Sequence, residues 1–128
     1  MKFFILLVFS LSTLVSHSQV SEKQGITKAI QEGNAKVLGS YFTKTVDLTV
    51  KDVEDVYSKE QAEVILTRFF NENITETYAV KHEGKSKLDD YYYIGDLITT
   101  TGTYRLTFFL KKDGETFRVK QLRIESGK

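Results

Sequence analysis

The sequence predicts an α+β fold in which two or three N-terminal helices pack on the concave face of a curved, mostly antiparallel sheet. Two observations predict it. Three segments in the first part of the chain carry apolar residues at helical spacing, whereas the second part consists of strand-length runs with alternating apolar and polar residues. Helices that precede a run of antiparallel strands are typical of folds in which the helices cover one face of the sheet. We therefore expect one α+β domain over residues 19–128.

Three segments have the pattern of a helix. Residues 21–34 contain an apolar stripe and end at a Gly-Asn pair, and residues 35–42 carry a second, shorter stripe. A third helix is expected to begin at Lys59, because Ser58 and Gln61 have the spacing of a capping box.

Six segments have the alternation of a strand, and two of them lie between the second and third helices. The predicted strands are residues 45–51, 53–57, 74–80, 91–100, 103–112 and 116–125. Asp113-Gly114 predicts a tight hairpin between the last two strands. Bulges are expected at Gly95 and at Lys120-Gln121, where the apolar phase of the last strand shifts. The helix stripes and strand faces should meet in one core containing Leu38, Phe42, Ile65, Phe69, Leu106 and Phe108.

This order of elements resembles the nuclear-transport-factor-like (cystatin-like) α+β cone superfamily. The resemblance is carried by residues 26–38, Ile-Thr-Lys-Ala-Ile-Gln-Glu-Gly-Asn-Ala-Lys-Val-Leu, by Tyr41-Phe42 after them, and by the final four-strand meander. The ending over residues 117–124 is similar to that of an uncharacterised family of small exported bacterial proteins. The resemblance extends over residues 20–126 and implies a cone with an interior pocket. Its motifs are patterning motifs, so it implies no particular reaction.

Residues 1–18 have the three-part pattern of a secretory signal peptide. A positive start is followed by an apolar stretch over residues 3–15, and Ser16 and Ser18 occupy the two positions that signal peptidase reads. Cleavage after Ser18 would make Gln19 the mature N-terminus. The alternative is an uncleaved anchor, but a membrane span needs about 20 apolar residues. We expect export to the periplasm or exterior of a bacterium, with no stable membrane span after cleavage.

The composition excludes several classes of site. Without Cys the chain has no disulfide, thiolate zinc site, iron–sulfur cluster or Cys nucleophile. Removing residues 1–18 takes Lys2 from the 18 basic residues, which leaves 17 basic against 17 acidic residues and a net charge of zero. A neutral chain has no strong field to attract nucleic acid. One histidine, His82, remains, and we expect neither a metal site nor a cofactor.

Catalysis in such a cone would need a carboxylate or an imidazole beside a phenol. Asp47 alternates with apolar neighbours and should face solvent, whereas Asp96 follows Gly95 and could face either way. His82 lies in a polar stretch and is expected at the surface. The acidic run at residues 52–55 lacks the ligand spacing of a calcium loop. No catalytic residue is therefore predicted.

Tyr104 is the first candidate for a ligand contact. It shares the apolar face of Phe108, which should meet the helices, whereas Arg105 must face the opposite way. A buried phenol needs a hydrogen-bond partner, either a core group or a bound ligand. Tyr41 and Tyr93 are the next candidates for the same wall of the cone.

Two further features are open to more than one interpretation. The run Tyr91-Tyr92-Tyr93 places at least one ring on each face of its strand, and an outward ring with Phe109 could form a dimer or carbohydrate-stacking face. Basic residues gather in residues 105–128, which could bind an anionic group or serve as ordinary solvent-facing charge.

Two functions from different classes remain open. The first is a non-catalytic exported domain that binds a small apolar or amphipathic ligand, or a protein partner, in its cone. The second is a small isomerase, dehydratase or cyclase that uses a Tyr and a carboxylate there. They differ in whether a carboxylate projects into the cone within hydrogen-bond reach of a Tyr. A homodimer through the sheet is compatible with either.

Overall fold

The computed structural model describes residues 20–127, and its elements follow the expected order of two helices, two strands, one helix and four strands. The predicted signal peptide and its cleavage site lie outside the described residues. The elements are α1 (Glu22–Gln31), α2 (Ala35–Gly39), β1 (Phe42–Val50), β2 (Val53–Ser58), α3 (Lys59–Glu72), β3 (Thr75–Lys85), β4 (Tyr91–Thr99), β5 (Gly102–Asp113) and β6 (Thr116–Ser126).

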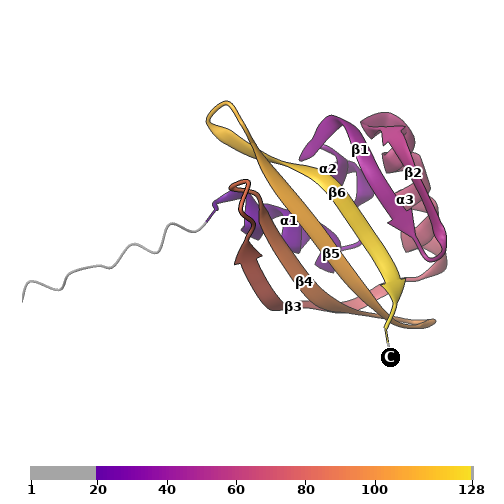
Figure 1. Cartoon of the computed structure of the whole chain (residues 1–128). Helices are drawn as coiled ribbons and strands as arrows, with labels where there is room; N and C mark the ends of the chain where they lie inside the picture. The colour runs from indigo at the N-terminus through magenta and orange to yellow at the C-terminus, as the bar shows by residue number, and fades with distance from the viewer. Residues whose placement is uncertain (1–19, 128) are drawn as a thin grey trace, which may run out of the picture.

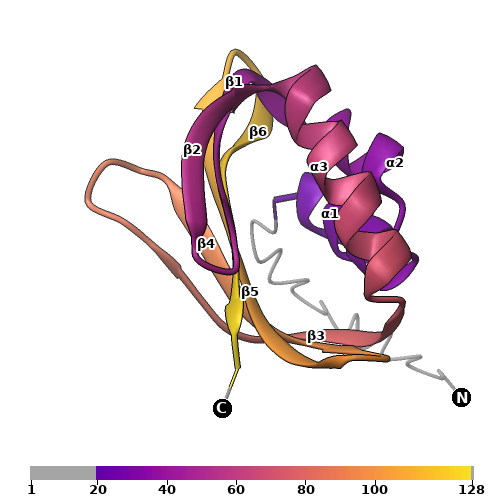
Figure 2. The same cartoon turned by 90° about the vertical axis from the view of Figure 1, so that its right-hand side faces the viewer.

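All six strands form one sheet in the order β2-β1-β6-β5-β4-β3 (Figure 1). Neighbouring strands are antiparallel except β1 and β6, which run parallel. The sheet curls around the three helices, which all lie on its concave side (Figure 2). The predicted α+β class is confirmed. No helix within residues 20–127 has the length and apolar character needed to cross a membrane.

The core lies between the helices and the concave face of the sheet. Five of the six predicted core residues are buried there, namely Leu38, Phe42, Phe69, Leu106 and Phe108. The sixth, Ile65, packs against the core but stays partly exposed. It lies at the margin of α3 beside Tyr57 of the edge strand β2, where the sheet ends and no further strand covers it.

The helix ends show where local sequence decides the structure. The Ser58 hydroxyl accepts from the backbone N–H of Gln61 at 3.2 Å and the Gln61 side chain accepts from the N–H of Ser58, so the predicted capping box is confirmed. The second helix was expected to reach Phe42 but ends at Gly39. Phe42 instead opens β1 and pairs with Val119, because burying its ring in the sheet continues the core.

One predicted bulge is confirmed and the other is wrong. Lys120 is the extra residue of β6, since Phe109 pairs with Gln121 and Leu110 with Val119. The bulge expected at Gly95 lies instead on the neighbouring strand β3, where the register shifts at Lys81 between Val80 and His82.

The absence of a side chain at Gly95 leaves space for the ring of Tyr78. A Cβ atom at Gly95 would lie 2.7 Å from the Tyr78 ring and 2.6 Å from the carbonyl oxygen of Ala79. The bare backbone lets the ring cross β4, and the phenol donates to the carbonyl oxygen of Leu106 on β5 at 3.0 Å. This buried contact ties three strands together on the concave side.

Candidate functional site

Tyr104 faces inward as predicted, and its phenol has a partner in the core. The side chain is 9% exposed and donates to Oδ1 of Asn73 at 3.2 Å, and its ring meets that of Phe69 edge to face at 5.3 Å. Asn73 is 3% exposed and donates to the carbonyl oxygen of Phe69 at 2.8 Å. Sequence reasoning did not identify Asn73 as the partner of this phenol. The role of Tyr104 as a ligand contact stays a prediction, and a ligand there would compete with Asn73 for the phenol.

Tyr93 also lies on the concave face, but near the start of α1. Its ring stacks on Phe108 with centroids 4.9 Å apart, and Nζ of Lys23 lies 5.2 Å from its centroid. Lys23 in turn donates to Oε2 of Glu83 at 2.9 Å. Burial, followed by the Glu83 carboxylate, raises the pKa of Tyr93 to about 12. The phenol is therefore protonated at neutral pH and is poorly matched to acid–base exchange there.

The three predicted tyrosines do not share one wall. Tyr93 pairs with Phe108 and Leu97 with Tyr104, so Tyr93 and Tyr104 are four residues apart along the sheet, which corresponds to about 13 Å. Tyr41 lies against α1, because a Cβ atom at Gly25 would come within 1.9 Å of its phenol oxygen. Tyr41 and Tyr93 both flank the start of α1, while Tyr104 lies at the end of α3.

A partly exposed aromatic cluster forms near the start of α1. Phe117 and Tyr91 meet edge to face at 5.3 Å, and the backbone N–H of Phe117 donates to Oε1 of Glu22 at 3.3 Å. We call Tyr41, Tyr91, Tyr93 and Phe117 the hairpin-end aromatic cluster. Tyr93 is buried at its base, and the other three are partly exposed.

Charges of both signs border this cluster. The Lys23–Glu83 salt bridge lies beside Tyr93, and Nζ of Lys85 lies 5.7 Å from the centroid of Tyr91. Apolar ring surface next to such charges suits a molecule with an apolar body and a polar end. Sequence reasoning identified three of the four rings and missed Phe117. Phe117 lies two residues before Val119 on the last strand, so the two side chains share a face, and this spacing could have indicated that Phe117 faces inward.

The run of three tyrosines alternates between the two faces. Tyr91 and Tyr93 face the helices, whereas Tyr92 lies on the convex face, 6.2 Å from the ring of Phe109. The sheet therefore carries two aromatic pairs at the same level, one on each face, Tyr91–Phe117 inside and Tyr92–Phe109 outside.

The candidate acid–base groups lie outside the cone. Asp96 is exposed and pairs across the ladder with Arg105, which faces outward as predicted, and His82 is exposed on β3. Asp47 lies on the same convex face, where burial, and then the Glu54 carboxylate, raise its pKa. Within residues 20–127 no tyrosine phenol is hydrogen-bonded to a carboxylate. The same residues hold no grouping of three His, Asp or Glu side chains suited to a metal ion.

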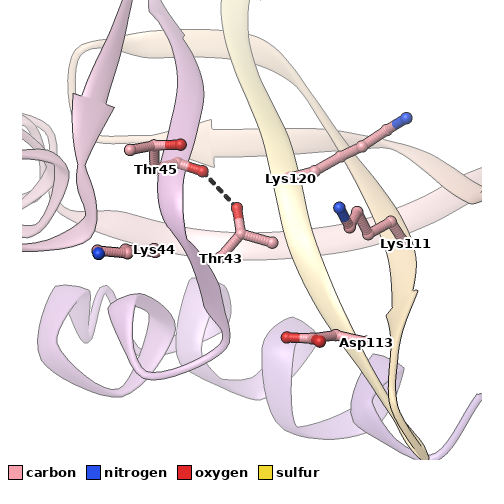
Figure 3. Close-up of a pocket in the computed structure, with 6 residues that line it drawn as sticks. All are labelled: Thr43, Lys44, Thr45, Lys111, Asp113 and Lys120. Atoms are coloured by element: carbon pink, nitrogen blue, oxygen red, sulfur yellow. Dashed lines mark hydrogen bonds between the residues drawn. The ribbon is translucent and has the colours of Figure 1, made fainter.

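A second feature is a hollow of about 380 Å³ where β1 separates from β6. Phe42 pairs with Val119 and Asp47 with Gln121, so the four β1 residues 43–46 stand against Lys120 alone and the strands part. The lining residues are Thr43, Lys44, Thr45, Lys111, Asp113 and Lys120 (Figure 3). The Thr43 hydroxyl donates to the carbonyl oxygens of Thr45 and Val119, the latter at 3.2 Å, and so holds the separated segment in place.

Comparisons with known proteins match both the sequence and the fold. Residues 23–125 match the model of the family DUF4783, described as a domain of unknown function. A DUF4783 family protein from Bacteroides ovatus is 29% identical, with a TM-score of 0.76 over 81% of this chain and 94% of that one. One from Bacteroides uniformis is 28% identical, with a TM-score of 0.77 over 82% and 96%. No curated protein matches.

More distant structures share the fold alone. A putative calcium/calmodulin-dependent protein kinase II association domain from Xanthomonas campestris is 15% identical, with a TM-score of 0.59 over 83% of each chain. An uncharacterised cystatin-fold protein from Novosphingobium aromaticivorans is 13% identical, with a TM-score of 0.58 over 82% of this chain and 95% of that one. The cone resemblance expected from the sequence is confirmed.

Proposed function

The chain belongs to the DUF4783 family, and we propose that it is an exported, non-catalytic domain that binds a small amphipathic ligand at the hairpin-end aromatic cluster. The observation that carries the proposal is the set of partly exposed rings on the concave face, bordered by Lys23, Glu83 and Lys85. Aromatic side chains supply a large apolar contact area, and the charged border suits a polar end group.

The distribution of acid–base groups supports binding over catalysis. The isomerase type of mechanism needs a carboxylate within hydrogen-bond reach of the reacting group. Asp47 and Asp96 instead lie on the convex face, and the two carboxylates beside the cluster, Glu22 and Glu83, already accept from Phe117 and Lys23. The high pKa of Tyr93 keeps its proton in place at neutral pH. A partner protein with an exposed apolar side chain is the alternative occupant of the cluster.

The proposal is tested with 1-anilinonaphthalene-8-sulfonate, a fluorescent molecule with an apolar body and one negative charge. We expect saturable binding to residues 19–128, and Phe117→Ala should weaken it about tenfold, which corresponds to a loss of ~1.4 kcal/mol. Phe109→Ala is the matched control, because Phe109 belongs to the aromatic pair on the opposite face. Equal affinities of the two variants, or no saturable binding by a cooperatively folded wild type, would contradict the proposal.

We further propose that two copies pair through the convex face of the sheet. This face carries apolar side chains on its central strands, namely Tyr92, Ile94, Ile98 and Phe109. Ile98 is 42% exposed, and the cross-strand pair Asp96–Arg105 places opposite charges within the patch, between Ile94 and Ile98. A two-fold interface places one patch against itself, so charges of both signs favour it. Sedimentation should give a dimer that Ile98→Glu converts to a monomer; a wild-type monomer at all concentrations would contradict pairing.

A further inference from the structure

We propose that the hollow between β1 and β6 binds a compact anionic group with two negative charges, either a phosphate ester or a pair of carboxylates. This site is separate from the aromatic cluster, because Lys111 alternates with Leu110 and lies on the convex face with Phe109. The lining contains three lysines and one aspartate, a charge balance of +2 that falls to +1 when Asp90, the salt-bridge partner of Lys120, is included; the predicted mature chain as a whole is neutral.

Lys111 is the principal donor to the bound group. Its ammonium points toward Thr43 across the hollow, as Figure 3 shows, and it forms no salt bridge with any residue between 20 and 127. The hydroxyl of Thr45 is the second donor, since it has no hydrogen bond to another described residue. The Thr43 hydroxyl proton already goes to backbone carbonyls, so Thr43 shapes the site instead of binding the anion.

Lys120 is a second cation at the hollow, and its charge is already paired before an anion binds. Its ammonium forms a salt bridge with Asp90, whose side chain is mostly buried, and it points away from Lys111 (Figure 3). A bound anion competes with Asp90 for this ammonium. Lys44 lies on the far side of β1 and adds charge without a direct contact. Asp113 repels an anion at the hairpin side of the hollow and so directs it toward Lys111 and Thr45.

The size of the hollow and its lining decide the ligand class. A volume of about 380 Å³ lies within the range of small-molecule sites. No large apolar side chain lines it, and lysine ammonium groups attract phosphate and carboxylate oxygens as point charges. We therefore infer a phosphorylated or multiply carboxylated small molecule.

The test is a titration of ¹⁵N-labelled residues 19–128 with inorganic phosphate and, separately, with citrate, at constant ionic strength. We expect saturable amide shifts confined to residues 43–45, 111–113 and 120, and to Asp90, which the anion displaces from Lys120. Lys111→Gln should weaken binding about fivefold, as for one solvent-accessible charged contact. The matched control is Lys112→Gln, which removes the neighbouring lysine from the opposite face of β5 and should leave the affinity unchanged.

A variant that is expected to raise the anion affinity separates a specific site from a general effect of surface charge. Asp90→Asn frees Lys120 and should tighten binding two- to fivefold, whereas a nonspecific effect of net charge would be reproduced by Glu76→Gln on β3. Saturation by phosphate alone supports a phosphate ester, and saturation by citrate alone supports a carboxylated ligand. Shifts that grow linearly with both anions, or equal losses in Lys111→Gln and Lys112→Gln, would overturn the proposal.

Discussion

Replacing Gly95 by alanine tests how the sheet holds its curved shape. The added methyl would lie 2.6 Å from the Ala79 carbonyl oxygen and 2.7 Å from the Tyr78 ring, so either the backbone of β3 or the ring must move. Overpacking of this kind costs about 1–3 kcal/mol. If the ring moves, the 3.0 Å hydrogen bond from Tyr78 to Leu106 is lost as well, and a buried unsatisfied group costs a further ~1–3 kcal/mol.

The expected loss for Gly95→Ala is therefore about 2–6 kcal/mol in the free energy of unfolding, a large part of the ~5–15 kcal/mol that domains usually have. Urea denaturation followed by circular dichroism measures it. Tyr78→Phe removes only the hydrogen bond and should cost about 1 kcal/mol. Gly39→Ala is the control, because the new methyl meets the flexible Glu63 side chain at 3.3 Å. If Gly95→Ala unfolds at the same urea concentration as Gly39→Ala, the close approach of Tyr78 is not a constraint on the fold.

Four further outcomes are expected. Phe69→Ala should destabilise the protein by ~3–5 kcal/mol in the same urea assay, and an unchanged midpoint would contradict the packing of α3 on the sheet. Folding raises the pKa of Asp47, so its negative charge destabilises the folded state at a pH above that pKa, and this destabilisation disappears below the unfolded value of 3.8. Asp47→Asn should therefore raise the thermal midpoint at pH 7, and the midpoints of the variant and the wild type should converge near pH 3.5. His82→Gln should leave folding and probe binding unchanged, and a loss of either would give the exposed imidazole a role. Intact-mass analysis of exported protein should find Gln19 as the first residue, whereas retention of Met1 would refute cleavage.

Features that depend on local patterning could be predicted from the sequence. Strict alternation in β5 predicted that the Tyr104 side chain faces the core and the Arg105 side chain faces solvent. The shift of the apolar phase after Val119 predicted the bulge at Lys120. Asp96 could not be placed, because its neighbour Gly95 has no side chain to indicate the phase. The structure resolves this ambiguity by directing Asp96 to solvent.

Features that depend on long-range pairing could not be predicted. Asn73 and Tyr104 are 31 positions apart, so the partner of the buried phenol follows only from how α3 ends against β5. The hollow likewise arises from the parallel pairing of β1 with β6, which nothing local indicates. Sequence reasoning supplied the aromatic residues near α1 but placed Tyr41, Tyr93 and Tyr104 on one wall, since it had no register for β4 against β5.

The most direct test of the binding function is native mass spectrometry of the protein recovered from its natural host. A bound ligand should appear as a discrete mass above that of residues 19–128 and should be released on denaturation. The matched pair of variants Phe117→Ala and Phe109→Ala assigns its place: the added mass should disappear from the first and persist in the second. Recovery of wild-type protein only at its unliganded mass, or loss of the ligand from both variants alike, would contradict binding at the hairpin-end aromatic cluster.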